Sequence, residues 1–264
     1  MLRFAAHLEM NFGKEVSFAD RWHAAADSGF AGCEFVWRQH EWQEVQDLRK
    51  ARPLQVSCMG GTTGFQTGGG RPLLTRPEDR EWLARDVRTA VDYAQRTACP
   101  RLIFVPGNLQ PGWSIERHRK EAVESLRAIV PIVEEAGVTV VLEPLNSKAD
   151  HPGIYCDSSA EAMRIVEQVG SRNVKLLYDI YHMQIMEGSL IETIRKHHDL
   201  IGYYHVAKVP GRHEPLGGEV NLPPVLEAIA ETGYDGFIGL EYSPERSAEE
   251  AYRSVKAAYP AYLR

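Results

Sequence analysis

The sequence has few cysteines and no long apolar run. Four cysteines are scattered along the chain without a Cys-x-x-Cys pair, at Cys33, Cys58, Cys99 and Cys156. Neither a zinc-thiolate site nor a redox motif is therefore expected. No stretch reaches about 18 uninterrupted apolar residues, and Arg3 and His7 come too early for a signal peptide. We expect reduced core thiols, no association with membranes and a cytoplasmic location.

The sequence also lacks an excess of positive charge. Its formal net charge is -6 and its isoelectric point is about 5.9, whereas binding to a phosphate backbone is driven by basic patches. We therefore expect no nucleic-acid partner. Hydrophobic residues make up 44% and charged residues 25% of the chain, which are the proportions of ordinary globular proteins. A large core can form without disulfides.

Short apolar runs alternate with longer amphipathic segments from end to end, which indicates repeated βα units and a parallel sheet. There are eight such runs, at residues 3–7, 32–37, 54–59, 101–106, 139–143, 174–179, 202–207 and 237–241. Eight units in 264 residues means about 33 residues each, which is typical of a closed barrel. The pattern predicts an α/β fold, a (β/α)₈ TIM barrel that forms a single domain over residues 1–264.

Helix boundaries are also visible in the sequence. Ser17, Ser158 and Ser247 each precede an acidic residue by three positions, the arrangement of a helix N-cap. Pro131 interrupts an otherwise strong helical pattern from about Glu116 to Ala136. We expect a kink or a break there, because proline removes a helical hydrogen bond.

Four consecutive apolar runs end in a polar residue that can bind a metal. These residues are Glu143, Asp179, His205 and Glu241, and they are separated by 36, 26 and 36 positions, one βα unit each. In a barrel the C-terminal ends of the strands converge at one rim. A single acid in this position is often only a helix cap or a surface charge. Four in register predict a site for Mn²⁺ or Mg²⁺, with Zn²⁺ or Co²⁺ as alternatives.

Two further residues follow these strand ends on predicted loops at the same rim. His182 and Arg212 can hold the oxygens of a substrate, although a packed histidine and a surface salt bridge are the alternatives. His213 and Glu214 are weaker candidates that can simply brace the loop. The glycine-rich stretch 60–70 lacks a phosphate-binding motif, and we interpret it as a mobile loop that can cover a small substrate.

The motifs together resemble the hydroxypyruvate isomerase family. They are LEPLN at 142–146, DIYHMQ at 179–184, HVA at 205–207, PGRHEP at 210–215 and EVN at 219–221. The family belongs to the xylose isomerase-like barrels, and the resemblance covers essentially the whole chain. The first strand, HLEM at 7–10, departs from the Asn-Leu-Ser wording common in the family, which leaves substrate contacts near this strand open.

The resemblance implies roles for the individual residues. Glu143, Asp179, His205 and Glu241 would be the ligands of one divalent metal ion, and Glu143 and Glu241 would also be the acid/base pair. Some family members have glutamine in place of His205. The implied reaction interconverts hydroxypyruvate and tartronate semialdehyde through an enediolate. Arg212, His182 or Lys148 would hold the carboxylate of the substrate.

Other functions remain open at this stage. The same residues permit a 3-epimerase or an isomerase of a longer keto-sugar or sugar acid, and a non-catalytic barrel that only binds a sugar is an alternative of another class. Endonuclease IV, a relative in the same superfamily, needs additional histidines at the ends of strands three and four, where this sequence has none. A homo-oligomer could form through Tyr252, Tyr259 and Tyr262, but packing in the core explains these residues equally well.

Overall fold

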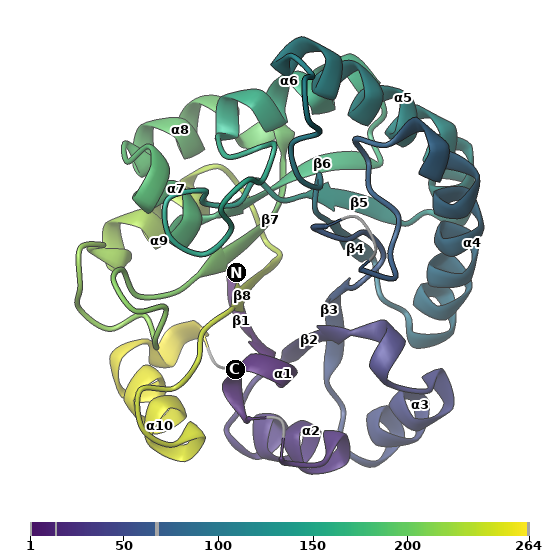
Figure 1. Cartoon of the computed structure of the whole chain (residues 1–264). Helices are drawn as coiled ribbons and strands as arrows, with labels where there is room; N and C mark the ends of the chain where they lie inside the picture. The colour runs from purple at the N-terminus through teal and green to yellow at the C-terminus, as the bar shows by residue number, and fades with distance from the viewer. Residues whose placement is uncertain (1, 14, 67–68, 263–264) are drawn as a thin grey trace.

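The chain folds into a ring of parallel strands surrounded by helices, as the computed structural model shows (Figure 1). The structure describes residues 2–13, 15–66 and 69–262. The strands pair in chain order and β8 returns to β1, which closes the barrel. The bounds of the strands are β1 Arg3–His7, β2 Gly32–Val36, β3 Gln55–Gly60, β4 Arg101–Phe104, β5 Thr139–Leu142, β6 Val174–Asp179, β7 Ile201–Val206 and β8 Phe237–Leu240.

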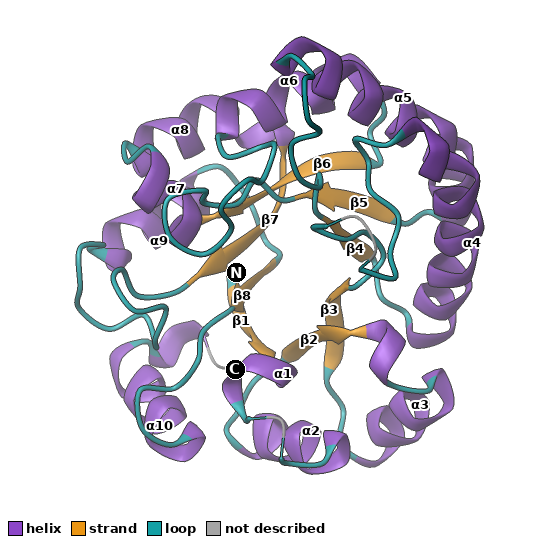
Figure 2. Ribbon diagram, in the orientation of Figure 1, coloured by secondary structure: helices purple, strands orange, loops and turns teal. Residues whose placement is uncertain are grey.

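Helices form the outer layer, and loops connect them to the strands at both ends of the ring (Figure 2). Their bounds are α1 Leu8–Asn11, α2 Phe18–Asp27, α3 Trp42–Ala51, α4 Arg80–Thr97, α5 Ile115–Ala136, α6 Ser159–Val169, α7 Ile180–Met186, α8 Leu190–His197, α9 Leu222–Glu231 and α10 Ala248–Ala258. The predicted (β/α)₈ barrel is therefore confirmed, and each predicted strand lies within one or two residues of the observed one.

The core has two layers that follow from the alternation of side chains along each strand. One face of the strands packs against the buried stripe of the helices; α4, for example, buries Leu83, Val87 and Val91 at helical spacing. The other face fills the interior of the barrel with a separate cluster of Ala5, Cys58, Val141, Leu177, Tyr203 and Phe237. The interior is thus packed, and the strand ends are where a site can form.

The predicted helix starts are confirmed. The side chains of Ser17, Ser158 and Ser247 accept hydrogen bonds from the third following backbone amide, at the starts of α2, α6 and α10. The break considered at Pro131 does not occur, because α5 continues through it from Ile115 to Ala136. Arg127 and Pro131 lie on the exposed side of α5, where water can replace the lost hydrogen bond.

Three other expectations concern the tyrosines near the C-terminal end, membrane-spanning helices and the cysteines. Tyr252 packs between the rings of Phe12 and Phe30, and Tyr259 and Tyr262 pack on Phe4. The three tyrosines therefore pack within the chain, and the homo-oligomer stays a prediction. Of the helices within the described part of the chain, none is long and apolar enough to cross a membrane. All four cysteines are free and buried, as predicted.

Candidate metal centre

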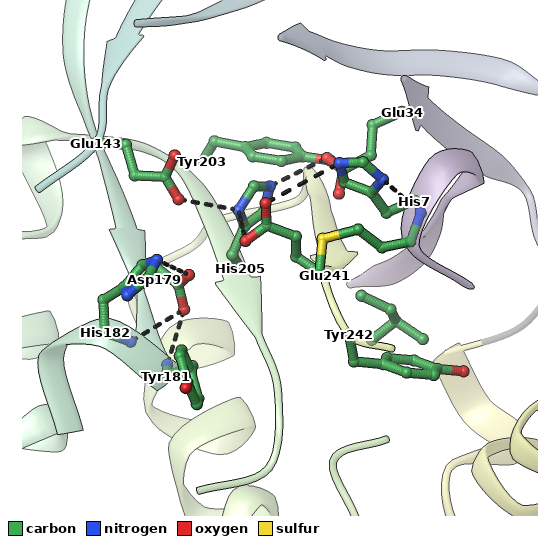
Figure 3. A network of polar contacts seen from close by, with 12 residues as sticks. His7, Glu34, Glu143, Asp179, Tyr181, His182, Tyr203, His205, Glu241 and Tyr242 are labelled. Atoms are coloured by element: carbon green, nitrogen blue, oxygen red, sulfur yellow. Dashed lines mark hydrogen bonds and ion pairs between the residues drawn. The ribbon is translucent and has the colours of Figure 1, made fainter. Parts of the chain in front are cut away.

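The four predicted ligands meet at the C-terminal rim of the barrel. Asp179 and His205 are paired across β6 and β7, and Gly239 lies opposite His205 on β8. Glu143 follows β5 and Glu241 follows β8 by one residue. One ligand atom from each of Glu143, Asp179, His205 and Glu241 lies within 4.8 Å of the others. Residues that are far apart in sequence therefore form one compact group of three carboxylates and one imidazole (Figure 3).

His205 lies at the centre of this group. Its Nδ1 atom is 3.3 Å from Glu143 Oε1 and 3.4 Å from Glu241 Oε2. Its Nε2 atom faces the opposite way and lies 3.1 Å from Glu34 Oε2. The ring is completely buried, so these carboxylates are its polar surroundings. Nδ1 is therefore the nitrogen that His205 presents to the group.

The two carboxylate oxygens of Asp179 have different surroundings: one caps a helix and the other faces the cluster. Oδ1 caps α7, accepting hydrogen bonds from the amides of Tyr181 at 2.7 Å and His182 at 3.4 Å. Oδ2 is buried and makes no hydrogen bond among the described residues, although His182 Nε2 lies 3.5 Å from it. A buried carboxylate oxygen without a partner is costly. The orphaned atom is thus available as a ligand.

The crowded carboxylates shift one another's pKa values. Burial, followed by the charge of Glu241, raises the pKa of Asp179 to about 7 and also raises the pKa of Glu143. Burial alone would raise the pKa of Glu241 too, but Arg212 and then His205 hold it well below its usual range. Burial would lower the pKa of His205, but Glu34 and Glu241 raise it well above its usual value. The positive charges of Arg212 and His205 thus offset the crowding of the carboxylates only in part, because the pKa values of Asp179 and Glu143 are still raised.

The donor atoms and the charge of the cluster suit a divalent metal ion. Its donors are three carboxylates and one imidazole nitrogen, which suit Mn²⁺, Mg²⁺ or Zn²⁺. The unpartnered Oδ2 atom of Asp179 and the converging negative charge are both features that a cation would satisfy. The residues present therefore fit such an ion.

Arg212 and His182 lie beside the cluster, as predicted. The Arg212 guanidinium donates to Glu241 Oε2 through Nη2, which is also 3.3 Å from His182 Nε2. The Nε atom of Arg212 is buried, and the described residues provide no acceptor for it. Burial, followed by the charge of Arg212, lowers the pKa of His182 well below its usual value, and Asn146 Nδ2 lies 2.7 Å from its Nδ1 atom. His182 is therefore neutral and oriented.

The loop that carries Arg212 is anchored to the end of β8. Arg212 has a left-handed backbone with φ of 54°, and its carbonyl accepts a hydrogen bond from the amide of Ser243 at 3.0 Å. His213 Nδ1 lies 2.9 Å from the Ser243 carbonyl, and Glu214 accepts a hydrogen bond from the Glu245 amide. The weaker candidates His213 and Glu214 thus brace this loop, which was the alternative reading of both.

Lys148 is the one predicted site residue that the structure does not bring to the cluster. Its ammonium group donates to the carbonyls of Ile185 at 3.0 Å and Met186 at 3.2 Å, at the C-terminal end of α7. The side chain is exposed. Cations are favoured at a helix C-terminus, and this placement satisfies Lys148 without a substrate.

Sequence reasoning missed the role of Glu34, which contacts His205 directly. Its exposed fraction is 1%, and it lies inside the apolar strand β2. A glutamate is almost never buried without a partner, so an acid inside an apolar run was the signal that could have pointed to it. His7, at the end of β1, also reaches the site, with Nε2 4.0 Å from Glu241 Oε1.

The glycine-rich loop after β3 borders a cavity next to the site. The cavity has a volume of about 370 Å³, and its walls include Phe65, Arg71, Asn108 and His151. The ring of Phe65 stacks on His151, whose ring faces His182 at a centroid distance of 5.5 Å. Residues 67 and 68 of this loop lie outside the described residues. The loop thus adjoins the site, and whether it moves stays a prediction.

The fold and the cluster define the class: a (β/α)₈ barrel with a carboxylate and histidine centre at its C-terminal rim. A family model described as "Xylose isomerase-like TIM barrel" matches residues 22–258. The chain belongs to this family, which confirms the resemblance predicted from the motifs.

Named relatives extend over nearly the whole chain. Hydroxypyruvate isomerase of Escherichia coli is 32% identical, with 96% of this chain and 98% of the relative aligned. A 2-oxo-tetronate isomerase of Cupriavidus necator is 33% identical, with 92% and 94% aligned. Both relatives are isomerases, which confirms the predicted enzyme class. A solved structure described as an AP endonuclease, family 2, from Brucella melitensis superimposes with a TM-score of 0.90 at 29% identity, covering 99% of both chains.

Proposed function

We propose that this protein is a metal-dependent isomerase that interconverts hydroxypyruvate and tartronate semialdehyde through an enediolate. The observation that carries the proposal is the convergence of Glu143, Asp179, His205 and Glu241 within 4.8 Å beside an arginine with an unused donor. The relationship to hydroxypyruvate isomerase at 32% identity supports the substrate.

Glu143, Asp179, His205 and Glu241 would hold the ion, with Mn²⁺ or Mg²⁺ as the first choice and Zn²⁺ or Co²⁺ as alternatives. When bound, such an ion supplies positive charge that stabilises negative charge on neighbouring substrate oxygens. Asp179 Oδ2, which makes no hydrogen bond among the described residues, and His205 Nδ1, which faces Glu143 and Glu241, are two of the ligand atoms that this chain directs to the site. The remaining chemistry belongs to the side chains around the substrate.

The two glutamates would carry the protons. In the forward direction C3 of hydroxypyruvate loses a proton, C2 gains one, and the proton of the C3 hydroxyl is transferred to the oxygen on C2. Glu143 follows β5 and Glu241 follows β8, so their carboxylates reach the site from different strands. One glutamate would take the proton from C3 and the other would return a proton to C2.

Arg212 would bind the carboxylate of the substrate. Its guanidinium is held by Glu241 and its buried Nε atom has no partner within the described part of the chain, so a donor is available for an incoming oxygen. Arginine suits carboxylates because its donors form a planar fork. Neutral His182, fixed by Asn146, would contact an oxygen next to it. Lys148 would need to leave the end of α7 to take part.

A longer sugar acid or a ketose is the second candidate substrate, acted on by isomerisation or 3-epimerisation. The cavity of about 370 Å³ next to His151 offers space beyond the cluster, and a relative is named for 2-oxo-tetronate. Nuclease activity is not proposed. Endonuclease IV needs a three-metal cluster, whereas the described residues contain a single group of close metal-binding side chains, and the additional histidines at the ends of strands three and four are missing.

We further propose that the enzyme works in the cytoplasm. Its four cysteines are free and buried, and burial raises the pKa values of all four thiols, to about 12 for Cys99. A fold that needs no disulfide suits a reducing compartment.

The test is turnover by protein stripped with a chelator and then reloaded with Mn²⁺ or Mg²⁺. Hydroxypyruvate, 2-oxo-tetronate and a panel of ketoses are supplied separately. We expect the stripped protein to be inactive and the reloaded protein to form tartronate semialdehyde. Metal-dependent activity on ketoses alone would replace the proposed substrate. Sugar binding without metal and without turnover would indicate a non-catalytic barrel.

A further inference from the structure

We propose that Glu34 is a positioning residue that fixes the tautomer of His205, so that His205 presents Nδ1 to the metal. This inference rests on the proposed metal site and deepens it. Glu34 is not one of the four ligands, and it approaches the imidazole from the side opposite to Glu143 and Glu241 (Figure 3).

The first support is the pair of contacts made by the two ring nitrogens. His205 Nε2 lies 3.1 Å from Glu34 Oε2, whereas Nδ1 lies 3.3 Å from Glu143 Oε1. A neutral imidazole has one N–H donor and one acceptor nitrogen. When His205 gives up its Nδ1 proton to bind a cation, the proton that stays on Nε2 is donated to Glu34, and the lone pair of Nδ1 is directed into the ligand cluster.

The second support is the way in which Glu34 itself is held. Tyr203 donates its hydroxyl proton to Glu34 Oε2 at 3.0 Å, and Ser57 Oγ lies 2.8 Å from that hydroxyl. The exposed fractions of Glu34, Tyr203 and Ser57 are 1% or less. Strands β2, β3 and β7 each supply one of these side chains. The acceptor for His205 is therefore built into the barrel wall.

The third support is the space made by Gly239. A Cβ atom at this position would lie 2.5 Å from Glu34 Oε1 and 2.6 Å from His205 Cδ2. Gly239 is opposite His205 in the β7–β8 register. Because Gly239 has no side chain, the Glu34 carboxylate and the His205 imidazole can meet beside β8. A larger residue at this position would push them apart.

These contacts match a general feature of histidine ligands. A metal-binding histidine commonly donates its second nitrogen to a carboxylate, and loss of that partner weakens metal binding by roughly 10–100-fold. Tyr203 is neutral at this site because burial raises its pKa well above its usual value. Of the three side chains behind His205, Glu34 is therefore the one that accepts a hydrogen bond from the imidazole.

The experiment compares Mn²⁺ binding by the wild-type protein, Glu34→Gln and Glu34→Leu, measured by calorimetry on chelator-stripped protein. The matched control is Glu161→Gln, which changes another buried glutamate; Glu161 lies on α6 and pairs with Arg119 of α5 and with Tyr155. We expect the Kd of Glu34→Leu to rise by roughly 10–100-fold. Glu34→Gln keeps an acceptor oxygen and should lose less, and the control should bind as the wild type does.

Nitrogen-15 spectra of the imidazole rings in Mg²⁺- or Zn²⁺-loaded wild-type protein provide a readout that does not depend on any variant folding. The inference predicts that His205 keeps its proton on Nε2. A proton on Nδ1, or unchanged Mn²⁺ affinity in folded Glu34→Leu, would overturn the inference while leaving the metal site intact. If the wild-type protein bound no divalent metal, the proposed function would itself be wrong.

Discussion

We expect Glu143→Gln to lower kcat for hydroxypyruvate by about 10²–10⁴-fold. Glutamine has nearly the same shape and keeps an oxygen that can face the ion, but its amide cannot take or return a proton. Glu143 is 4% exposed and lies 3.3 Å from His205 Nδ1, so no water molecule is expected to replace it freely. Initial rates at saturating substrate and metal measure the effect.

Glu161→Gln is the control for this experiment as well, because it removes a buried carboxylate that lies on α6 and contacts Arg119. It should leave kcat near the wild-type value. Metal binding by Glu143→Gln must be measured in parallel, so that a lost ion is not mistaken for a lost proton carrier. Substantial turnover by metal-loaded Glu143→Gln would rule out Glu143 as an acid/base residue.

The second large effect is a gain in stability. In the metal-free protein we expect Asp179→Asn to raise the free energy of unfolding by about 1–3 kcal/mol, which corresponds to a Tm increase of about 2–4 °C per kcal/mol at this size. Asparagine keeps the Oδ1 acceptor that caps α7. Its amide also places a donor where Asp179 Oδ2 has none, next to the other carboxylates.

The same substitution should abolish stabilisation by metal. A ligand at about 100 times its Kd stabilises a protein by roughly 2.7 kcal/mol, so Mn²⁺ should raise the Tm of the wild-type protein but leave that of Asp179→Asn unchanged. Thermal unfolding with and without Mn²⁺ measures both effects. A less stable metal-free Asp179→Asn would contradict the cost assigned to the buried Asp179 carboxylate, and a variant that Mn²⁺ still stabilises would contradict the assignment of Asp179 as a ligand.

The pH dependence has a definite sign. The pKa of Asp179 rises from 3.8 to about 7 on folding, so the native state holds a proton that the unfolded state has lost between these values. This contribution to stability is therefore full below about pH 4 and disappears as the pH rises through about 7. The difference in Tm between metal-free Asp179→Asn and wild type should grow over this range.

The eight strands and the four clustered residues could be predicted because each depends on local pattern. Apolar runs mark the strands, and parallel strand ends in a barrel must share one rim, which brings Glu143, Asp179, His205 and Glu241 together without any knowledge of loops. Helix starts at Ser17, Ser158 and Ser247 are equally local.

Contacts between distant strands could not be predicted in the same way. The pairing of Glu34 with His205 joins positions 171 residues apart, and the space for it comes from Gly239 on a third strand. The surroundings of Lys148 could not be predicted either: the resemblance implies a contact with the substrate carboxylate, whereas in the structure its ammonium group donates to the carbonyls of Ile185 and Met186 at the end of α7. Contacts of this kind depend on the three-dimensional arrangement of strands and loops, which local sequence patterns do not specify.

The most direct test of the account is isomerisation of hydroxypyruvate in D₂O, followed by NMR at early times against a control without enzyme. Proton transfer through two glutamates predicts that the new C2–H bond of tartronate semialdehyde carries deuterium from the solvent. If the enzyme-formed product instead retained the C3 hydrogen of the substrate at C2, that hydrogen would have reached C2 without exchange with solvent, and proton transfer through the two glutamates Glu143 and Glu241 would be wrong.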